Sequence, residues 1–382
     1  MTAQDEPTWC LTGPVLAGPE HSGTGPGGTS GAVPGPLWAH QGRVTFAEPD
    51  HSGTGTAETV EGWVLPGLVD VHCHIGLGPD GPVDSETARA QAVADLRAGT
   101  LLVRDAGSPA DTRWLDGDPL APRIIRAGRH LARPKRYLRH YARELDAVEN
   151  LPAAMAQEAA RGDGWVKLVG DWIDRSAGPE ADLTPLWPRG ELIAGVAAAH
   201  AAGARVTVHT FATETVDDLL DAGVDCIEHG TGMRADQIER AAAAGIPVVP
   251  TMLQVANFEA IAAQGEAKFP RFAARMRAMY ERRNQQVRDF HDAGVQLLLG
   301  TDAGGTIGHG RMADEAAALV EAGIPAADVV AAAAWSAREF LGAPGLVEGA
   351  PADLVVYPGD PRDDITVLAH PRAVFRAGRR IV

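Results

Sequence analysis

The sequence contains little cysteine, and this scarcity excludes one class of protein. Its 382 residues include only three cysteines, Cys10, Cys73 and Cys226. A small, odd number in a chain of this length does not indicate the disulfide framework that holds small secreted domains together. We therefore expect a fold stabilised by a large hydrophobic core, for which the hydrophobic content of 45% is sufficient.

Positive charge and long apolar runs are also scarce. The chain has 34 Lys and Arg against 50 Asp and Glu, a formal net charge of −16. Nucleic acids and anionic membranes bind basic surfaces, so neither is an expected partner. No apolar run approaches the roughly 20 residues that span a bilayer, and the first residues lack the basic and apolar regions of a signal peptide. The sequence predicts a soluble cytoplasmic protein with a small-molecule substrate and leaves homo-oligomer formation open.

Short strand-like segments without helical periodicity lie near both ends of the chain. They are residues 9–12, 37–45, 58–64, 353–356 and 373–381. Residues 17–36 are rich in Gly, Ser, Pro and Thr, which is typical of a surface loop. Because chain termini often lie close together, we expect residues 1–63 and 345–382 to form one small β-sandwich domain.

Between these ends, Ala-rich helical stretches repeatedly end in Ala-Gly and are followed at once by an apolar strand. Glycine ends a helix readily because it adopts the left-handed conformation without a Cβ penalty. Eight strands are expected, at residues 68–71, 101–104, 123–127, 165–169, 205–208, 224–227, 247–249 and 295–299. Apolar strands that alternate with helices predict an α/β fold, a (β/α)8 TIM-type barrel over residues 64–344. A doubly wound open sheet is the alternative on this pattern alone.

Nitrogen- and oxygen-bearing side chains lie at the ends of five of these strands. The first strand runs into a His-Cys-His sequence, whose two histidines share one side because residues i and i+2 of a strand point the same way. Taken singly, each histidine fits a buried core residue and the aspartate fits a helix cap. Since the active site of such a barrel lies at the carboxyl ends of its strands, the joint pattern predicts a metal site. The predicted ligands are His72, His74, Lys167, His209, His229 and Asp302.

Two of these motifs resemble signatures of the amidohydrolase superfamily. Residues 66–74, Pro-Gly-Leu-Val-Asp-Val-His-Cys-His, resemble its opening motif, and residues 300–304, Gly-Thr-Asp-Ala-Gly, resemble its eighth-strand motif. The chain is similar along essentially its whole length to members of the Xaa-Pro dipeptidase and imidazolonepropionase type. The resemblance implies a binuclear centre in which Lys167, carboxylated by CO2, bridges two divalent ions. The remaining ligands would be His72, His74 and Asp302 on one ion and His209 and His229 on the other.

The position of Lys167 supports a carbamate. An ammonium inside a barrel is a costly buried charge and would repel the metals, whereas a carbamate is an anionic bridging ligand. The alternative is an unmodified Lys167 that pairs with a nearby carboxylate beside a single ion. Histidine and oxygen ligands suit zinc, our preferred assignment, and also manganese, iron or cobalt.

Such a centre predicts a hydrolase that cleaves a carbon–nitrogen amide bond. A divalent ion lowers the pKa of bound water to about 7 and so provides the attacking hydroxide, and Asp302 is expected to act as general base and then acid. A dipeptide, an N-acyl amino acid or a cyclic amide is the expected substrate, while lactone or phosphotriester hydrolysis stays open. Deamination is disfavoured because Ala212 replaces the glutamate of relatives that resemble adenosine deaminase. An inactive binding protein would be expected to lack a ligand, and none is missing.

Loops that follow the strands contain further polar and aromatic side chains that are candidates for contact with substrate. The loop after the third strand is basic, and an arginine there can bind a carboxylate through two parallel hydrogen bonds. A solvated basic surface is the alternative interpretation of that loop. The predicted substrate-binding residues are His130, Arg136, Tyr137, Trp172 and His309.

Overall fold

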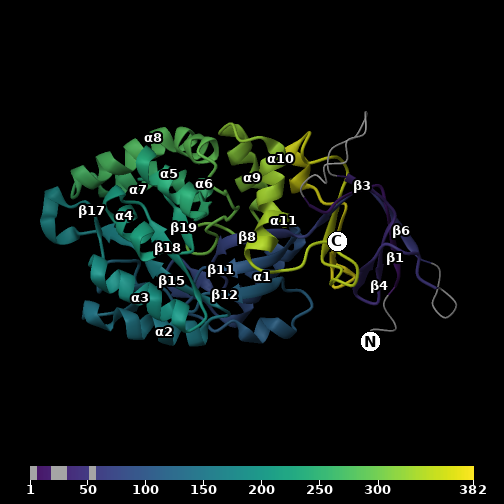
Figure 1. The fold of residues 1–382 in the computed structure, drawn as a ribbon, viewed down its shortest axis with the longest axis horizontal. Helices are drawn as coiled ribbons and strands as arrows, with labels where there is room; N and C mark the ends of the chain where they lie inside the picture. The colour runs from purple at the N-terminus through teal and green to yellow at the C-terminus, as the bar shows by residue number, and fades with distance from the viewer. Residues whose placement is uncertain (1–6, 19–31, 51–56) are drawn as a thin grey trace.

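The computed structural model describes residues 7–18, 32–50 and 57–382, and its centre is a set of parallel strands surrounded by helices (Figure 1). These strands are almost completely buried, which explains their near-continuous apolar sequences. They are β8 (Leu68–Cys73), β11 (Thr100–Asp105), β12 (Arg123–Arg126), β15 (Trp165–Val169), β18 (Arg205–Thr210), β19 (Cys226–His229) and β20 (Val248–Val249).

Hydrogen bonds connect these strands in sequence order. Strand β11 pairs in parallel with β8 and β12, and β15, β18, β19 and β20 pair in parallel in that order. The amide of Lys167 donates to the carbonyl of Ala127, 3.3 Å away, and so links β15 to the residue after β12. Because all these strands run in parallel, their carboxyl ends lie at one end of the set.

The segment predicted as the eighth strand lies between β20 and β8 but is not a regular strand. Isolated parallel bridges join Leu297 to Val248 and Ala303 to Cys73. The prediction of a continuous strand at residues 295–299 is therefore wrong. A side chain at Gly300 would lie 2.6 Å from Cβ of His72, so the backbone that follows this segment approaches β8 too closely for any residue but glycine.

Helices cover the outside of the strand set (Figure 1). All five glycines predicted to end helices, at positions 99, 203, 223, 245 and 294, have φ between 66° and 91°. In the described ranges, no helix has the length and apolar character needed to cross a membrane. The helices are α1 (Ser85–Arg97), α2 (Leu151–Arg161), α3 (Arg189–Ala201), α4 (Thr213–Ala222), α5 (Ala235–Ala244), α6 (Met252–Val255), α7 (Phe258–Gly265), α8 (Pro270–Asp292), α9 (Met312–Glu321), α10 (Ala326–Ala333) and α11 (Trp335–Phe340).

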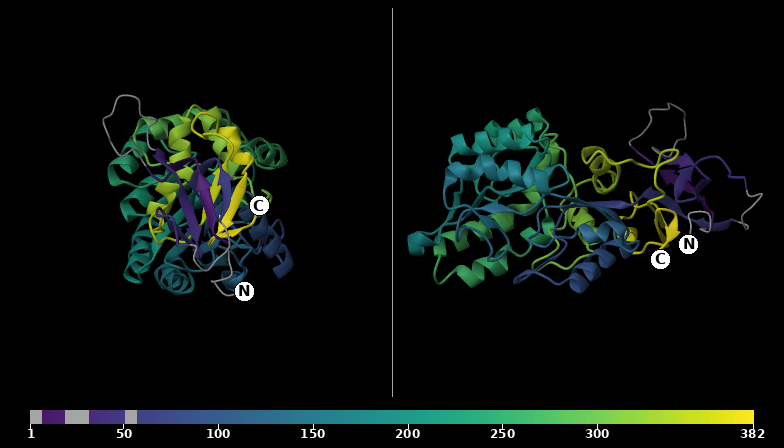
Figure 2. Two further views of the ribbon diagram at one scale, coloured as in Figure 1. Left: turned by 90° about the vertical axis from the view of Figure 1, so that its right-hand side faces the viewer. Right: turned by 90° about the horizontal axis from the view of Figure 1, so that it is seen from below.

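Strands from both ends of the chain lie side by side at one end of the molecule, in two sheets (Figure 2). One sheet has the order β5-β4-β1-β6, and the other has the order β23-β22-β21-β7-β2-β3. The strands are β1 (Trp9–Thr12), β2 (Pro14–Leu16), β3 (Ala32–Pro34), β4 (Leu37–His40), β5 (Arg43–Thr45), β6 (Glu58–Glu61), β7 (Trp63–Pro66), β21 (Leu354–Tyr357), β22 (Ala373–Arg376) and β23 (Arg379–Arg380).

The loop predicted for residues 17–36 differs in part from the structure. Ala32–Pro34 form β3, which pairs antiparallel with β2, so the loop prediction is wrong there. A composition rich in small and polar residues does not reveal a strand whose partner lies earlier in the chain. Residues 19–31, in the middle of the predicted loop, lie outside the described residues.

Strand β7 connects the terminal sheets to the parallel strands. It pairs antiparallel with β21 and lies across the predicted boundary at residue 63, and β8 begins two residues after it. The amide of Gly67, between β7 and β8, donates to the carbonyl of Asp353 (3.0 Å), and its carbonyl accepts from Arg338 (2.9 Å). Between the two sheets, Trp9, Val64 and Phe375 are part of one buried hydrophobic cluster.

Candidate metal centre

Three of the predicted ligands meet at the carboxyl end of β8. Oδ1 of Asp302 lies 3.1 Å from Nε2 of His72 and 3.1 Å from Nε2 of His74, and the two nitrogens are 3.3 Å apart. Ligand atoms about 2.0 Å from one tetrahedrally coordinated ion lie roughly 3.3 Å from one another. The spacing of these three atoms therefore fits a single divalent cation.

The hydrogen bond on the other side of the His74 ring fixes which nitrogen faces the cluster. Nδ1 of His74 donates to the carbonyl of Gly107 over 2.7 Å, so in the neutral ring Nε2 carries the lone pair. That lone pair points at a second imidazole nitrogen and at a carboxylate oxygen. Electron-rich atoms in such contact repel one another unless a cation lies among them, which is the second observation that fits a metal.

His209 and His229 form a second pair beside the first group. Nδ1 of His209 lies 3.0 Å from Nε2 of His229. The hydroxyl of Thr251 donates to the carbonyl of Pro250, so its oxygen accepts from Nδ1 of His229, 2.6 Å away. Nε2 of His229 is therefore left as an acceptor, and the buried Nε2 of His209 has no hydrogen-bond partner. Both rings thus have a nitrogen available for a metal.

Lys167 lies between these groups, and its Nζ forms an ion pair with the carboxylate of Glu228. The sequence interpretation missed Glu228, which precedes His229 in an otherwise apolar strand. Its other oxygen accepts from Thr207 (2.7 Å) and from Arg104 (3.2 Å), and Glu228, His72 and His229 form a further group of closely spaced ligand atoms. The only available signal was a carboxylate in a buried strand, a residue type that is almost never fully buried unless it is paired.

The backbone is strained at the ends of β19 and β20 and at Asp302. His229, Thr251 and Asp302 have φ of 66°, 48° and 55°, in the left-handed region that non-glycine residues rarely adopt. Such strain costs about 1–3 kcal/mol per residue and is concentrated at functional sites. His229 and Asp302 are predicted ligands, and Thr251 is hydrogen-bonded to His229.

A buried carboxylate positions the histidine and aspartate backbones. Asp70 accepts from the amide of His72 (3.0 Å) and from both the amide and the hydroxyl of Thr301 (3.1 and 2.6 Å). Burial raises the pKa of Asp70 to about 7, opposed by these hydrogen bonds. Asp70 thereby ties β8 to the segment that ends in Asp302.

Burial and mutual proximity shift the pKa values of the cluster. Burial lowers the pKa of His72 and of His209 well below 6.5, which keeps both rings neutral. Burial also lowers the pKa of Lys167 to about 7. Burial alone would raise the pKa of Asp302, but the neighbouring histidines, His72 above all, hold it well below its usual value. Neutral imidazoles and an ionised carboxylate are the forms that bind metals.

A cavity of about 570 Å³ opens above this cluster. His74, His209 and Asp302 lie in its wall, and so do two of the residues predicted to contact substrate, Tyr137 and Trp172. The ring of Tyr137 lies 4.8 Å from that of Trp172 and 5.7 Å from that of His209, measured between centroids. The volume is within the range of roughly 300–1,000 Å³ typical of small-molecule sites.

The other three predicted substrate contacts do not line this cavity. His130 is fully buried beneath it, stacks on His74 with a centroid distance of 5.0 Å, and has no hydrogen-bond partner at either ring nitrogen. Arg136 donates to the carbonyls of Trp172 and Thr184. His309 donates through Nδ1 to Asp95 over 2.8 Å.

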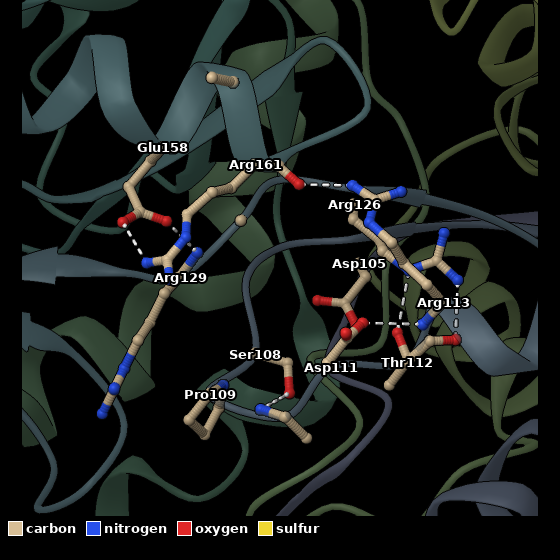
Figure 3. Close-up of a pocket in the computed structure, with 13 residues that line it drawn as sticks. Asp105, Ser108, Pro109, Asp111, Thr112, Arg113, Arg126, Arg129, Glu158 and Arg161 are labelled. Atoms are coloured by element: carbon tan, nitrogen blue, oxygen red, sulfur yellow. Dashed lines mark hydrogen bonds and ion pairs between the residues drawn. The ribbon is translucent and has the colours of Figure 1, made fainter.

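A second cavity, of about 470 Å³, lies beside β12 and contains none of the predicted ligands (Figure 3). Its arginines have partners within the chain. Arg161 pairs with Glu158 (3.3 Å), and Arg126 pairs with Asp116 and Asp163 (2.7 and 3.1 Å). These charges are already compensated, so we assign no chemistry to this cavity.

Comparison with known proteins agrees with this geometry. The model of the amidohydrolase family matches residues 63–381. Uncharacterized proteins of Mycobacterium tuberculosis and Mycobacterium bovis are 51% identical over 345 residues, which are 90% of this chain and 91% of theirs.

Solved structures share the fold along nearly the whole chain. A Xaa-Pro dipeptidase with bound methionine superimposes with a TM-score of 0.79 at 22% identity, covering 98% of this chain and 99% of that one. A putative prolidase from Bifidobacterium longum gives 0.79 at 21% identity (99% and 95%), and an A. niger ochratoxinase gives 0.76 at 19% (98% and 96%). At these identities the likeness establishes the fold, which is of the TIM-barrel type with mixed α/β content.

Proposed function

Because the chain belongs to the amidohydrolase family and is therefore a hydrolase of carbon–nitrogen bonds, we propose that it cleaves an amide bond of a small molecule at a binuclear metal centre. The observation that carries this proposal is the contact among His72, His74 and Asp302 beneath the 570 Å³ cavity. Members of the family use divalent metals, and neutral imidazoles with an ionised carboxylate are the forms that bind them.

We assign the six residues to two ions, with zinc as the preferred metal. His72, His74 and Asp302 would hold one ion, and His209 and His229 would hold the other. Lys167 would bridge them as a carbamate after its amine leaves Glu228. The neighbouring Thr251 and Gly107 support this assignment because each accepts a hydrogen bond from the outer ring nitrogen of a proposed ligand histidine.

The reaction requires an activated water, a polarised carbonyl and a group that transfers a proton. When bound, the divalent cations activate water at neutral pH and polarise the scissile carbonyl. Asp302 takes a proton from the attacking water and delivers it to the leaving nitrogen.

The domain organisation is part of the same proposal. Residues 64–344 would form the catalytic barrel, and residues 1–63 and 345–382 would form one small β-sandwich domain. The buried cluster that contains Trp9, Val64 and Phe375 supports this division, since its members come from both ends of the chain.

Substitution of Asp302 by Asn tests the mechanism. We expect Asp302→Asn to keep most of the metal, because the amide oxygen remains a ligand, and to lose at least about 100-fold in kcat, because it cannot accept the proton. Metal content is measured by mass spectrometry of the ions, and hydrolysis is measured on a panel of N-acyl amino acids, X-Pro dipeptides, cyclic amides, lactones and phosphotriesters.

An exposed aspartate supplies the control, and Asp314→Asn on α9 should leave both readouts unchanged. Near-normal turnover in Asp302→Asn would remove Asp302 from the mechanism. Hydrolysis of lactones or phosphotriesters but of no amide by the wild-type protein would contradict the proposed substrate bond.

A further inference from the structure

The cavity wall beyond the metal ligands is apolar on one side. Phe211, after β18, and Ile261, on α7, face the cavity together with Phe269, Phe272 and Met276, which lie at the start of α8 or within it. Phe211 and Met276 also belong to one buried hydrophobic cluster with Phe272. We call these five residues the apolar wall. A wall of this kind binds a large aliphatic or aromatic group and disfavours a charged one.

Among the described residues that line the cavity, the single lysine or arginine is Arg175, at the start of the 3-10 helix η3 (Arg175–Glu180). Apart from the proposed ligand Asp302, no aspartate or glutamate is among the described lining residues. Among the described lining residues, the cavity therefore offers a ligand one positive charge, on the exposed side chain of Arg175, and no negative charge other than that of Asp302.

Neighbouring arginines have partners within the chain, whereas Arg175 has none among the described residues. Arg271 and Arg275 on α8 pair with Asp182 at 3.1 and 2.9 Å, and Arg136 pairs with Asp174 at 3.5 Å. In the part of the chain that the structure describes, the guanidinium of Arg175 contacts no carboxylate or carbonyl. Since α8 packs against η3, Arg175 lies near the apolar wall.

We propose that the substrate is an N-acyl amino acid with a large apolar side chain. This inference rests on the proposed function and selects one of its substrate classes. The side chain would pack on the apolar wall, and the carboxylate would pair with Arg175. In the reaction, the oxygen of water bonds to the acyl carbon, the C–N bond breaks, and the nitrogen leaves with a proton as the free amino acid.

The first experiment measures kcat/KM of the metal-loaded wild-type protein on three probes. N-acetyl-L-phenylalanine should exceed N-acetyl-L-alanine by about 10–200-fold, the range for gain of apolar contact in a pocket. N-acetyl-L-phenylalaninamide, which lacks the carboxylate, should be slower than the acid by at least about 10-fold. Equal rates for the phenylalanine and alanine derivatives would overturn the role of the apolar wall.

Two variants with matched controls separate the two contacts. Arg175→Gln should remove most of the difference in kcat/KM between N-acetyl-L-phenylalanine and its amide. Arg379→Gln, which replaces an exposed arginine on β23, should leave that difference unchanged. Ile261→Ser should reduce the preference for phenylalanine over alanine about 5–10-fold. Ala263→Ser, on the exposed side of the same helix, should leave that preference unchanged.

A binding measurement distinguishes failure of this inference from failure of the proposed function. Calorimetric titration should show that L-phenylalanine, the expected product, binds the wild-type protein more tightly than L-alanine and binds Arg175→Gln at least about 10-fold more weakly. This result without hydrolysis of any amide would contradict the proposed function alone. Amide hydrolysis without any preference for an apolar side chain or a carboxylate would contradict this inference alone.

Discussion

The contact between Lys167 and Glu228 makes the charge of the site depend on carboxylation. The ammonium form of Lys167 and the carboxylate of Glu228 neutralise one another. A carbamate on Lys167 would instead place two anions side by side in a buried space, which is costly without a cation. Carboxylation and metal binding should therefore stabilise each other, and neither should persist alone.

Native mass spectrometry tests this dependence at Lys167. We expect the metal-loaded protein to carry an adduct of about 44 Da, the mass of CO2, and to lose it when the metal is chelated. Lys167→Met should show no adduct under either condition. Two bound metals with an unmodified lysine would contradict the bridging assignment and favour Glu228 as the shared ligand.

His309 predicts a pH-dependent contribution to stability. Burial opposes its protonation, but the facing Asp95 and their hydrogen bond outweigh this effect and raise the pKa of His309 above 6.5. A raised histidine pKa stabilises the folded state below the unfolded pKa, and this stabilisation is lost as the pH rises through the folded pKa. The pair of His309 and Asp95 should therefore contribute most to the stability of the folded state at about pH 6 and progressively less above it.

The measurement compares thermal unfolding of wild type and His309→Gln across this pH range. The variant should be less stable by on the order of 1–3 kcal/mol at the acidic end, as expected for a hydrogen bond to a charged group, and the difference should shrink as pH rises. The exposed His370→Gln is the control. A stability difference between wild type and His309→Gln that grows with pH would contradict the predicted direction of the pH dependence.

Positions at strand ends made the proximity of the predicted ligand residues predictable, because parallel strands bring their carboxyl ends together whatever the loops do. Their contacts were not predictable. The partner of Lys167 is a strand residue that no motif marks, and Arg136 bonds to the carbonyls of Trp172 and Thr184, which the sequence places far from it. The sequence did not mark Arg175 as a candidate, because its place in the cavity lining and its lack of a partner among the described residues are properties that only a structure reveals.

Arg104 links three of the parallel strands. From β11 it donates through Nε to the carbonyl of Val71 on β8 (2.7 Å) and through a terminal nitrogen to Glu228 on β19 (3.2 Å), and it is fully buried. Its guanidinium also lies 4.8 Å from the ring of Trp165. The guanidinium of Arg104 thus connects these strands in addition to their backbone hydrogen bonds.

Removal of this charge should be costly. We expect Arg104→Met to lower the free energy of unfolding by about 3–5 kcal/mol, because loss of one partner leaves the buried Glu228 undercompensated. Arg240→Met, which breaks a half-exposed pair with Asp217 on the outer helices, should cost no more than about 1 kcal/mol. Chemical denaturation checks both values, and equal losses would refute a special role for Arg104.

Elements with a strong local signal were predicted well, and those that depend on distant partners were not. Apolar strands and Ala-Gly helix ends located β8, β15 and β18 to within two residues. The hairpin of β16 (Asp171–Ile173) and β17 (Leu183–Pro185) has polar residues and a long loop, so nothing in the sequence marks its pairing. The close approach of Gly300 to His72 on β8, directly after the expected eighth strand, is also a non-local contact.

The terminal sheets and the parallel strands should unfold together, because β7 belongs to one sheet and leads directly into β8. Phe375 on β22 is fully buried, and its ring lies 5.2 Å from that of Trp9. We expect Phe375→Ala to destabilise the whole chain by about 3–5 kcal/mol and to preserve a single unfolding transition with loss of bound metal. The partly exposed Phe46→Ala should stay within about 0.5 kcal/mol of wild type. Separate transitions for the two regions would contradict this coupling.

The pairing of β7 with β21 also sets an order of events during synthesis. Some 290 residues separate the two strands. The ribosome must therefore produce all of the parallel strands before β7 can pair with β21. Until then, β7 presents an open edge of the kind that recruits other chains. Translation pauses that expose nascent chains ending before residue 354 should therefore favour capture by chaperones, and a nascent chain that already includes β21 should escape it.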